Sequence, residues 1–144
     1  MSVEIKLIAA PETYALRKQE LRKNMTLSEK IPGDFEESTL HLGLYENNKL
    51  ACIATFMPAE NDLFKENQYR LRGMATDEKH QKKGYGKAVL LKAEEILKEK
   101  GIDLIWCNAR VVALDFYKKL GYEIIGGEFD IPQIGGHYVM FKNI

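Results

Sequence analysis

One stretch, residues 84–100, constrains the fold more than any other part of the chain. Apolar side chains recur along it at helical spacing, and charged side chains fill the opposite face. The apolar set is Val89, Leu90, Ala93, Ile96 and Leu97, and the charged set, which we expect to face water, is Lys92, Glu94, Glu95, Lys98 and Glu99. Gly101 follows at a position typical of a helix end. The sequence therefore predicts a long amphipathic helix.

Short apolar runs on both sides of this helix are typical of strands. Residues 3–7 alternate apolar and polar side chains, which is the period-2 pattern of a half-buried strand. Residues 39–45 and 50–56 flank a turn with Asn47 and Asn48, which predicts an antiparallel hairpin. Further strands are expected at 68–76, 104–107, 122–125 and 138–141, further helices at 11–24 and 113–120, and an irregular loop at 25–38. This order predicts an α/β fold with a mixed sheet.

Composition limits the classes of protein to consider. With 144 residues, 45% of them hydrophobic, the chain can bury one ordinary core, and we expect one domain over residues 1–144. Basic and acidic residues balance at 21 each, so no net charge favours nucleic acid or an anionic membrane as a partner. Neither a signal peptide nor a membrane span is evident, which favours the cytoplasm. Cys52 and Cys107 lie in apolar runs without metal-ligand spacing, so we expect buried, reduced thiols and no metal.

Residues 81–87, Gln-Lys-Lys-Gly-Tyr-Gly-Lys, join a predicted strand to the long helix and carry three lysines. A helix N-terminus is already partly positive, so lysines there are electrostatically unfavourable. A bound polyphosphate would explain them, because glycines let the backbone approach and free N–H groups hold the oxygens. The alternative is a solvated basic turn. A P-loop is excluded because no serine or threonine follows Lys87, and a dinucleotide fingerprint is excluded because Val89 stands in place of its third glycine.

This loop resembles the signature of the GNAT superfamily of acyl-CoA-dependent N-acyltransferases. In that family a strand leads into [QR]-x-x-G-x-[GA] at the start of a helix, and residues 81–86 match every fixed position. Residues 113–122, Ala-Leu-Asp-Phe-Tyr-Lys-Lys-Leu-Gly-Tyr, resemble the family's second signature. The motifs follow in the expected order, and the order of the elements matches along nearly the whole chain. The resemblance implies a mostly antiparallel sheet of about seven strands, flanked by helices, whose fourth and fifth strands splay apart.

The resemblance also implies which residues hold acetyl-CoA as the acyl donor. Backbone groups at the end of the fourth strand would pair with its pantetheine arm: Met74, Ala75 and Thr76. Loop amides would hold its pyrophosphate: Gln81, Lys82, Lys83, Gly84, Tyr85, Gly86 and Lys87. Asn108 would lie beside the thioester, and Tyr117 would protonate the leaving thiolate, or else serve only to pack its helix. Arg110 stands where many members have an asparagine that contacts the cofactor, so that contact is not carried over.

The general base and the acceptor site are less constrained. Many members carry a glutamate in the fourth strand, but residues 68–76 contain no carboxylate. The base is then a water relay or a histidine, His41 or His137, although either can be an ordinary structural histidine. His80, in the turn before the loop, is expected to be exposed.

Arg70 and Arg72 point to one face of a predicted central strand, where unpaired charge is costly. They could hold a substrate carboxylate in an acceptor cleft by forked hydrogen bonds. The alternative is a structural pairing with acids of the loop before the hairpin, namely Asp34, Glu36 or Glu37.

These features predict an N-acetyltransferase in which a primary amine attacks the thioester of acetyl-CoA directly. Backbone N–H groups of residues 74–76 would polarise the thioester carbonyl. The acceptor is a small amine, with the two arginines favouring one that carries a carboxylate, or an amine of a protein. The alternative function is a non-catalytic acyl-CoA sensor or partner-binding domain of the same fold. A homodimer would be consistent with the family, in which dimers are common.

Overall fold

A computed structural model describes residues 2–144. Its seven strands form one sheet in the order β1-β2-β3-β4-β5-β7-β6. The strands are β1 (Val3–Leu7), β2 (Leu40–Glu46), β3 (Lys49–Pro58), β4 (Gln68–Thr76), β5 (Leu104–Arg110), β6 (Glu123–Ile131) and β7 (Gly135–Asn143). Only β4 and β5 pair in parallel, and all other neighbours are antiparallel. The predicted mixed, mostly antiparallel sheet is confirmed.

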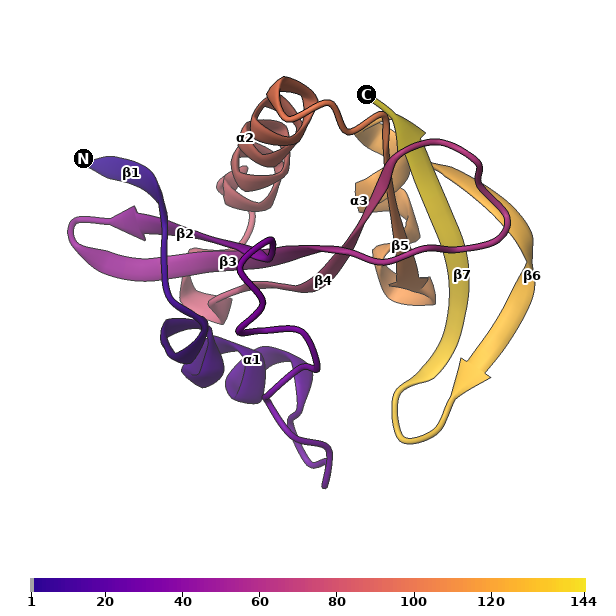
Figure 1. Ribbon diagram of the computed structural model, residues 1–144. Helices are drawn as coiled ribbons and strands as arrows, with labels where there is room; N and C mark the ends of the chain where they lie inside the picture. Colours follow the sequence, from indigo (N-terminus) through magenta and orange to yellow (C-terminus); the bar gives the residue numbers. More distant parts are fainter. Residues whose placement is uncertain (1) are drawn as a thin grey trace.

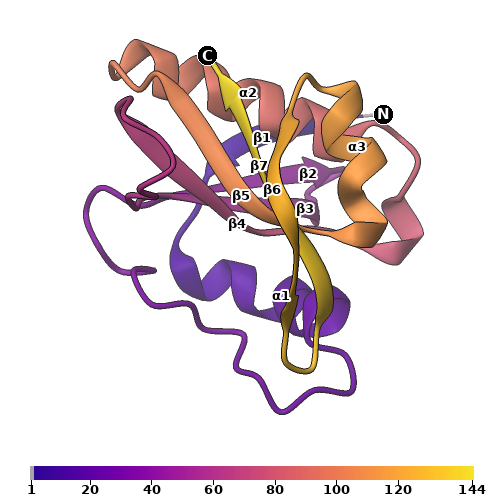
Figure 2. The ribbon, with the colours of Figure 1, turned by 90° about the vertical axis from the view of Figure 1, so that its right-hand side faces the viewer.

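Helices cover both faces of this sheet. The helices are α1 (Tyr14–Leu21), α2 (Tyr85–Glu99) and α3 (Leu114–Lys119), with 3-10 turns at Ala10–Thr13, Glu78–His80 and Val111–Ala113. Helix α1 lies on one face, and α2 and α3 lie on the other (Figures 1 and 2). Within residues 2–144, no helix combines the length and the apolar character needed to cross a bilayer.

The predicted apolar face of α2 is confirmed. Val89, Leu90, Ala93 and Leu97 are fully buried, and Ile96 packs against the same core. The prediction that Glu94 faces water is wrong. Its carboxylate accepts a hydrogen bond from the Tyr122 hydroxyl (3.0 Å) and one from Lys142 Nζ (2.8 Å), because both residues lie beside α2 in the folded chain.

The observed ends of helices and strands differ most from the predicted ends where polar residues or glycines interrupt the hydrophobic pattern. The N-terminal helix is shorter than expected, since a 3-10 turn precedes α1 and the helix stops at Leu21. Strand β5 continues past the apolar run to Arg110. Strands β6 and β7 are longer than predicted, and β6 includes a register shift between Ile125 and Phe129. Gly126 and Gly127 lie within that shift. They interrupt the alternation of apolar and polar side chains, so the sequence pattern did not predict that the strand continues past Ile125.

The predicted splay between β4 and β5 is present. Their register covers three pairs only, Gln68 with Leu104, Tyr69 with Ile105 and Arg70 with Trp106. Beyond these pairs β4 continues to Thr76 and β5 to Arg110 with no register between them. Figure 1 shows β5, β7 and β6 turning away from the first four strands at this point. The far end of β4 therefore presents backbone N–H and C=O groups that have no partner on β5.

Candidate active site

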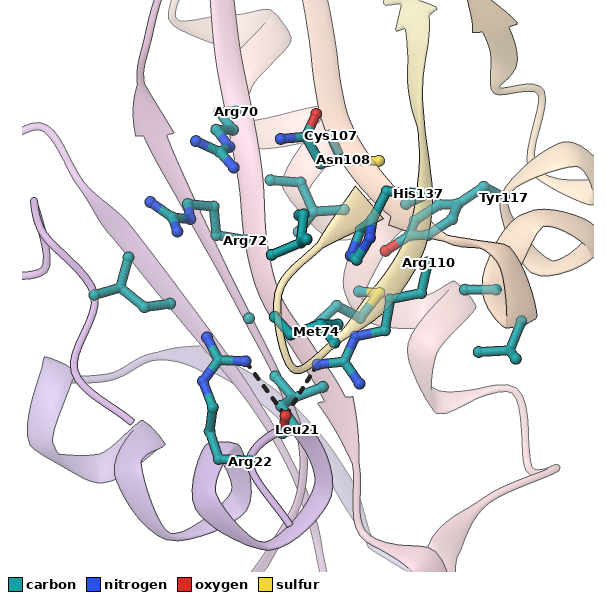
Figure 3. Close-up of a pocket in the computed structure, with 18 residues that line it drawn as sticks. Leu21, Arg22, Arg70, Arg72, Met74, Cys107, Asn108, Arg110, Tyr117 and His137 are labelled. Atoms are coloured by element: carbon teal, nitrogen blue, oxygen red, sulfur yellow. Dashed lines mark hydrogen bonds between the residues drawn. The ribbon is translucent and has the colours of Figure 1, made fainter. Parts of the chain in front are cut away.

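A cavity of about 300 Å³ lies where β4 and β5 diverge. Its walls come from the end of α1, from β4 and β5, from the turn that begins α3, and from the β6–β7 hairpin (Figure 3). Cavities of this size are at the lower end of those that hold small ligands. The cavity joins elements from both halves of the sheet, so its shape depends on the splay.

A β-bulge at Gly73 divides β4 along the cavity wall. Gly73 and Met74 together lie opposite the single residue Ala54, because Ile53 pairs with Ala75 and Thr55 pairs with Arg72. Gly73 has a φ of +61°, and a Cβ on it would lie 3.0 Å from Arg17 Nε. Bulges turn a strand and redirect its side chains. The residues before and after Gly73 therefore face different parts of the cavity region.

The segments predicted to hold the acyl donor lie along the splayed edge of β4 and at the start of α2. Met74 and Asn108 line the cavity, whereas Ala75 and Thr76 lie farther along β4 toward the loop. Residues 81–87 do not line the cavity but follow β4 and lead into α2. The structure thus places the predicted donor residues in two adjoining regions. One is the gap between the diverging ends of β4 and β5, called the slot below, and the other is the loop of residues 81–87.

The loop leaves the first turn of α2 open to a ligand. Gly84 is the N-cap residue, has a φ of +78° and provides no side chain to cap the helix. Lys82 is also in the left-handed region, with a φ of +65°. The first N–H groups of a helix have no partner inside it, so an uncapped N-terminus suits an anion.

One of the three loop lysines has a structural partner. Lys83 Nζ lies 2.9 Å from Glu46 Oε1, and the Tyr85 hydroxyl donates a hydrogen bond to the same oxygen. These hydrogen bonds from Lys83 and Tyr85 lower the pKa of Glu46. The basic turn is therefore partly neutralised by β2. Lys82 and Lys87 are exposed and form no ion pair within residues 2–144.

The expectation that His80 is exposed is wrong. Its side chain is buried, and its Nε2 lies 3.1 Å from Glu46 Oε2. The turn of residues 78–80 packs against the end of β2, which a reading of the local sequence does not reveal. Glu46 therefore fixes both His80 and Lys83, and so holds the loop from two sides.

Gly84→Ala is expected to destabilise the protein by about 1–2 kcal/mol, because an L side chain at positive φ is strained. No atom lies within 4 Å of the added Cβ, so the cost comes from the backbone alone. Urea unfolding of the variant measures it. Gly127→Ala is the matched control, since that glycine also has open space but no positive φ. Equal losses in the two variants would show that the left-handed conformation of Gly84 is not required.

Tyr117, the predicted general acid, lies on α3 with its hydroxyl toward the cavity (Figure 3). Its ring packs edge-on against Phe116 and Tyr122, with centroids 5.0 Å and 5.7 Å away. The hydroxyl makes no hydrogen bond to any other residue of the described chain. Burial raises the pKa of Tyr117 well above its ordinary value, while the nearby Arg110 opposes the rise. The side chain thus combines a packed ring with an available, protonated hydroxyl.

The two candidate histidines have different surroundings. His137 is buried on β7 and lines the cavity, and its Nδ1 lies 2.7 Å from the Gly135 carbonyl. Because a carbonyl only accepts, Nδ1 carries the proton and Nε2 of the neutral ring is an acceptor. His41 does not line the cavity. Its nitrogens contact Thr55 Oγ1 and the Asp34 carbonyl, both at 2.8 Å, so the ring has no nitrogen left for a substrate.

Both cysteines are buried and unpaired with each other, as predicted. Burial raises the pKa of Cys52 to about 11 and that of Cys107 to about 12. Cys107 lines the cavity but is protonated at neutral pH, which disfavours it as a nucleophile. Among residues 2–144 there is no cluster of three or more His, Cys, Asp or Glu side chains that could bind a metal.

Four arginines line the cavity: Arg22, Arg70, Arg72 and Arg110. Arg110 and Arg22 both donate to the Leu21 carbonyl at the end of α1, at 3.0 Å and 3.3 Å (Figure 3). A helix C-terminus is partly negative, so it suits these cations. Sequence reasoning identified Arg70 and Arg72 but not Arg22, whose position just after a helix is common for an arginine and gave no functional signal. Arg110 in place of the family's asparagine was the only hint of this second pair.

The structural pairing considered for Arg70 and Arg72 is not observed. Asp34 instead forms a forked ion pair with Arg17, with N–O distances of 2.8 Å and 3.0 Å. The other two candidate acids, Glu36 and Glu37, are exposed. Arg17 lies on α1, far enough from Asp34 in sequence that no local pattern links them.

A seven-stranded sheet in this order, with a cavity where its two parallel strands diverge, is the architecture of an acyl-CoA-dependent N-acyltransferase. The chain belongs to the acetyltransferase (GNAT) family, whose model matches residues 6–122. The protein is 39% identical over 144 residues to the uncharacterized N-acetyltransferase YitI of Bacillus subtilis, a match that covers 99% of this chain and 97% of that protein.

Solved structures share the fold at lower sequence identity. The ribosomal-protein-S18-alanine N-acetyltransferase from Escherichia coli superposes with a TM-score of 0.79 at 21% identity, covering 99% of this chain and 94% of that one. The PaiA N-acetyltransferase from Thermoplasma acidophilum, solved in complex with coenzyme A, gives a TM-score of 0.70 at 19% identity over the full length of both chains. These likenesses concern the fold.

Proposed function

We propose that this enzyme transfers an acetyl group from acetyl-CoA to a primary amine in the cavity between β4 and β5, in the cytoplasm. The observation that carries the proposal is the unpaired edge of β4 beside the Tyr117 hydroxyl. A strand edge without a partner suits an extended polar chain, as pantetheine is, and the hydroxyl suits the end where a thiolate leaves.

The donor would lie along the slot from the loop to the cavity. Residues 74–76 would hydrogen-bond the pantetheine arm, and amides of residues 81–87 would hold the pyrophosphate at the uncapped start of α2. Exposed Lys82 and Lys87 would add charge there. Asn108, across the slot from β4, would face the thioester end.

The chemistry would be a direct attack. The amine nitrogen bonds to the thioester carbon, and the carbon–sulfur bond breaks. The nitrogen loses one proton to His137 Nε2, directly or through water, and the thiolate gains one from Tyr117. A backbone N–H of residues 74–76 would stabilise the carbonyl oxygen as its negative charge develops. This chain has no carboxylate on β4, so His137 is the candidate base that the geometry favours.

Acetyl-CoA should raise the thermal stability of the protein, since a ligand at 100 times its Kd adds roughly 2.7 kcal/mol to the folded state. Differential scanning calorimetry measures the shift, with ATP and NAD as controls that share parts of the nucleotide. A shift with acetyl-CoA alone would support the donor site, and thiol release with amines would then test transfer. No shift would reject the proposal, while a shift without transfer to any amine would favour an acyl-CoA sensor.

A further inference from the structure

No carboxylate lines the cavity that holds the four arginines. Figure 3 draws the 18 residues that line the cavity, and none of these is aspartate or glutamate. Arg70 and Arg72 extend from β4 on one side, and Arg22 and Arg110 meet at the end of α1 on another. Four guanidinium groups therefore lie around a cavity of about 300 Å³ whose lining includes no acidic side chain. Such an arrangement repels itself unless an anion is present.

Arg70 and Arg72 also have donors to spare. Arg70 stacks on the Trp106 ring, with 4.9 Å from its guanidinium carbon to the ring centroid, and its buried Nε has no hydrogen-bond acceptor. Arg72 forms no side-chain hydrogen bond to another described residue. Burial and the charge of Arg72 lower the pKa of Arg70 to about 10, so Arg70 remains charged at neutral pH. Burial and the charges of Arg22 and Arg17 also lower the pKa of Arg72. A planar guanidinium with open donors suits a carboxylate or phosphate.

Neither of the other anions within reach accounts for these arginines. Asp34 is already bound by both terminal nitrogens of Arg17, and it also accepts the N–H of Ile31 at 2.9 Å. The phosphates of the acyl donor are assigned to residues 81–87, and none of these residues lines the cavity. Arg70 and Arg72 lie before the Gly73 bulge, and residues 74–76 lie after it. The positive charge of the two arginines is therefore available to the acceptor.

We infer that the acceptor is an amine bearing a doubly charged anionic portion, either a phosphate monoester or a pair of carboxylates, held by Arg70 and Arg72 with Arg22 beside them. This inference rests on the proposed function and narrows its acceptor from amines in general to anionic amines. Cationic polyamines would be repelled by the four guanidinium groups of this cavity.

Binding to the CoA-saturated protein tests the inference independently of turnover, because CoA then occupies the loop. Isothermal titration calorimetry would compare O-phosphoethanolamine with ethanolamine, and glutamate with glutamine. We expect at least one anionic probe to bind at least about 10-fold more tightly than its less charged partner, since hydrogen bonds to charged groups are strong. The pair that shows the difference identifies phosphate or dicarboxylate. Equal affinities within both pairs, or no binding, would overturn the inference.

Arg70→Gln and Arg72→Gln should each raise the Kd of the preferred probe about 10-fold or more and leave the Kd of CoA unchanged. The melting temperature of Arg72→Gln should stay equal or rise, because this variant relieves repulsion without breaking a hydrogen bond. Arg70→Gln also loses the stacking on Trp106, which offsets that relief. Lys98→Gln is the control, since it removes one positive charge from an exposed site on α2. Lower melting temperatures with an unchanged preference would show that the arginines are structural and would reject the inference.

Thiol release from acetyl-CoA with the same four amines separates this inference from the proposed function. Faster transfer to the anionic member of a pair supports both. Transfer that ignores the charge of the amine rejects the inference and leaves the acetyltransferase proposal standing. Selective binding of an anionic probe without transfer supports the anion site and rejects the assigned reaction.

Discussion

Tyr117→Phe is expected to lower kcat by about 10²- to 10⁴-fold, the usual contribution of a general acid, while the Kd of acetyl-CoA stays unchanged. Phenylalanine keeps the ring that packs against Phe116 and Tyr122 and removes only the hydroxyl at the cavity. Because the pKa of Tyr117 is raised by burial, the hydroxyl stays protonated throughout the neutral range. Deprotonation of the Tyr117 hydroxyl should therefore not limit the wild-type rate below about pH 10. Steady-state kinetics and calorimetric titration measure the two quantities.

Tyr122→Phe is the matched control for this substitution. Tyr122 is also buried, in contact with Tyr117, but its hydroxyl bonds Glu94 and it does not line the cavity. The control should lose about 1–3 kcal/mol of stability and keep its kcat. If Tyr117→Phe retained full activity across the pH range, the general-acid assignment would fail and Tyr117 would be a packing residue.

Asp34→Ala is expected to destabilise the protein by about 3–5 kcal/mol, which is typical when one partner of a buried ion pair is removed. Arg17 and Asp34 are almost fully buried, with 1% and 2% of their side chains exposed. Without Asp34, Arg17 keeps hydrogen bonds to the Glu29 carbonyl and Thr55 but has no countercharge. Chemical unfolding measures the loss, and Glu36→Ala, on the same loop but exposed, should change stability by less than about 0.5 kcal/mol.

The same ion pair should make stability depend on acid pH. Burial raises the pKa of Asp34. The hydrogen bonds from Arg17 and from the Ile31 N–H lower this pKa by more than burial raises it, so the net shift is downward. A lowered pKa stabilises the fold above the unfolded value of about 3.9. That contribution is lost as pH falls through the folded pKa. The stability gap between wild type and Asp34→Ala should therefore narrow only in strong acid, and a gap that narrowed near pH 7 would contradict the assignment.

Local patterns were enough to predict the sheet and the position of the lysine-rich loop before α2. The apolar stripe from Val89 to Leu97 follows directly from helical spacing. The lysines and glycines of residues 81–87 are unusual at a helix start, and this local conflict left two interpretations, a bound polyphosphate or a solvated basic turn. The splay itself came from the family resemblance, since no local pattern states that two parallel strands pair over three residues and then separate.

The polar partners could not be predicted, because they join residues distant in the chain. Glu46 meets His80 and Lys83 only after β2 and the loop are brought together, and Arg17 reaches Asp34 across the end of α1. Charged residues at such positions are equally compatible with a solvated surface. Alternation could place Arg70 and Arg72 on one face, but only the folded chain shows that the loop acids do not pair with them.

The divergence of β4 and β5 has a consequence for the cohesion of the molecule. Only three residue pairs join these strands, at one end, so along the rest of their length the two halves of the sheet share no direct ladder. An acyl donor lying in the slot would bridge the halves through its own amides. The two halves of the sheet would then be held together more firmly while the donor is bound than after coenzyme A has left.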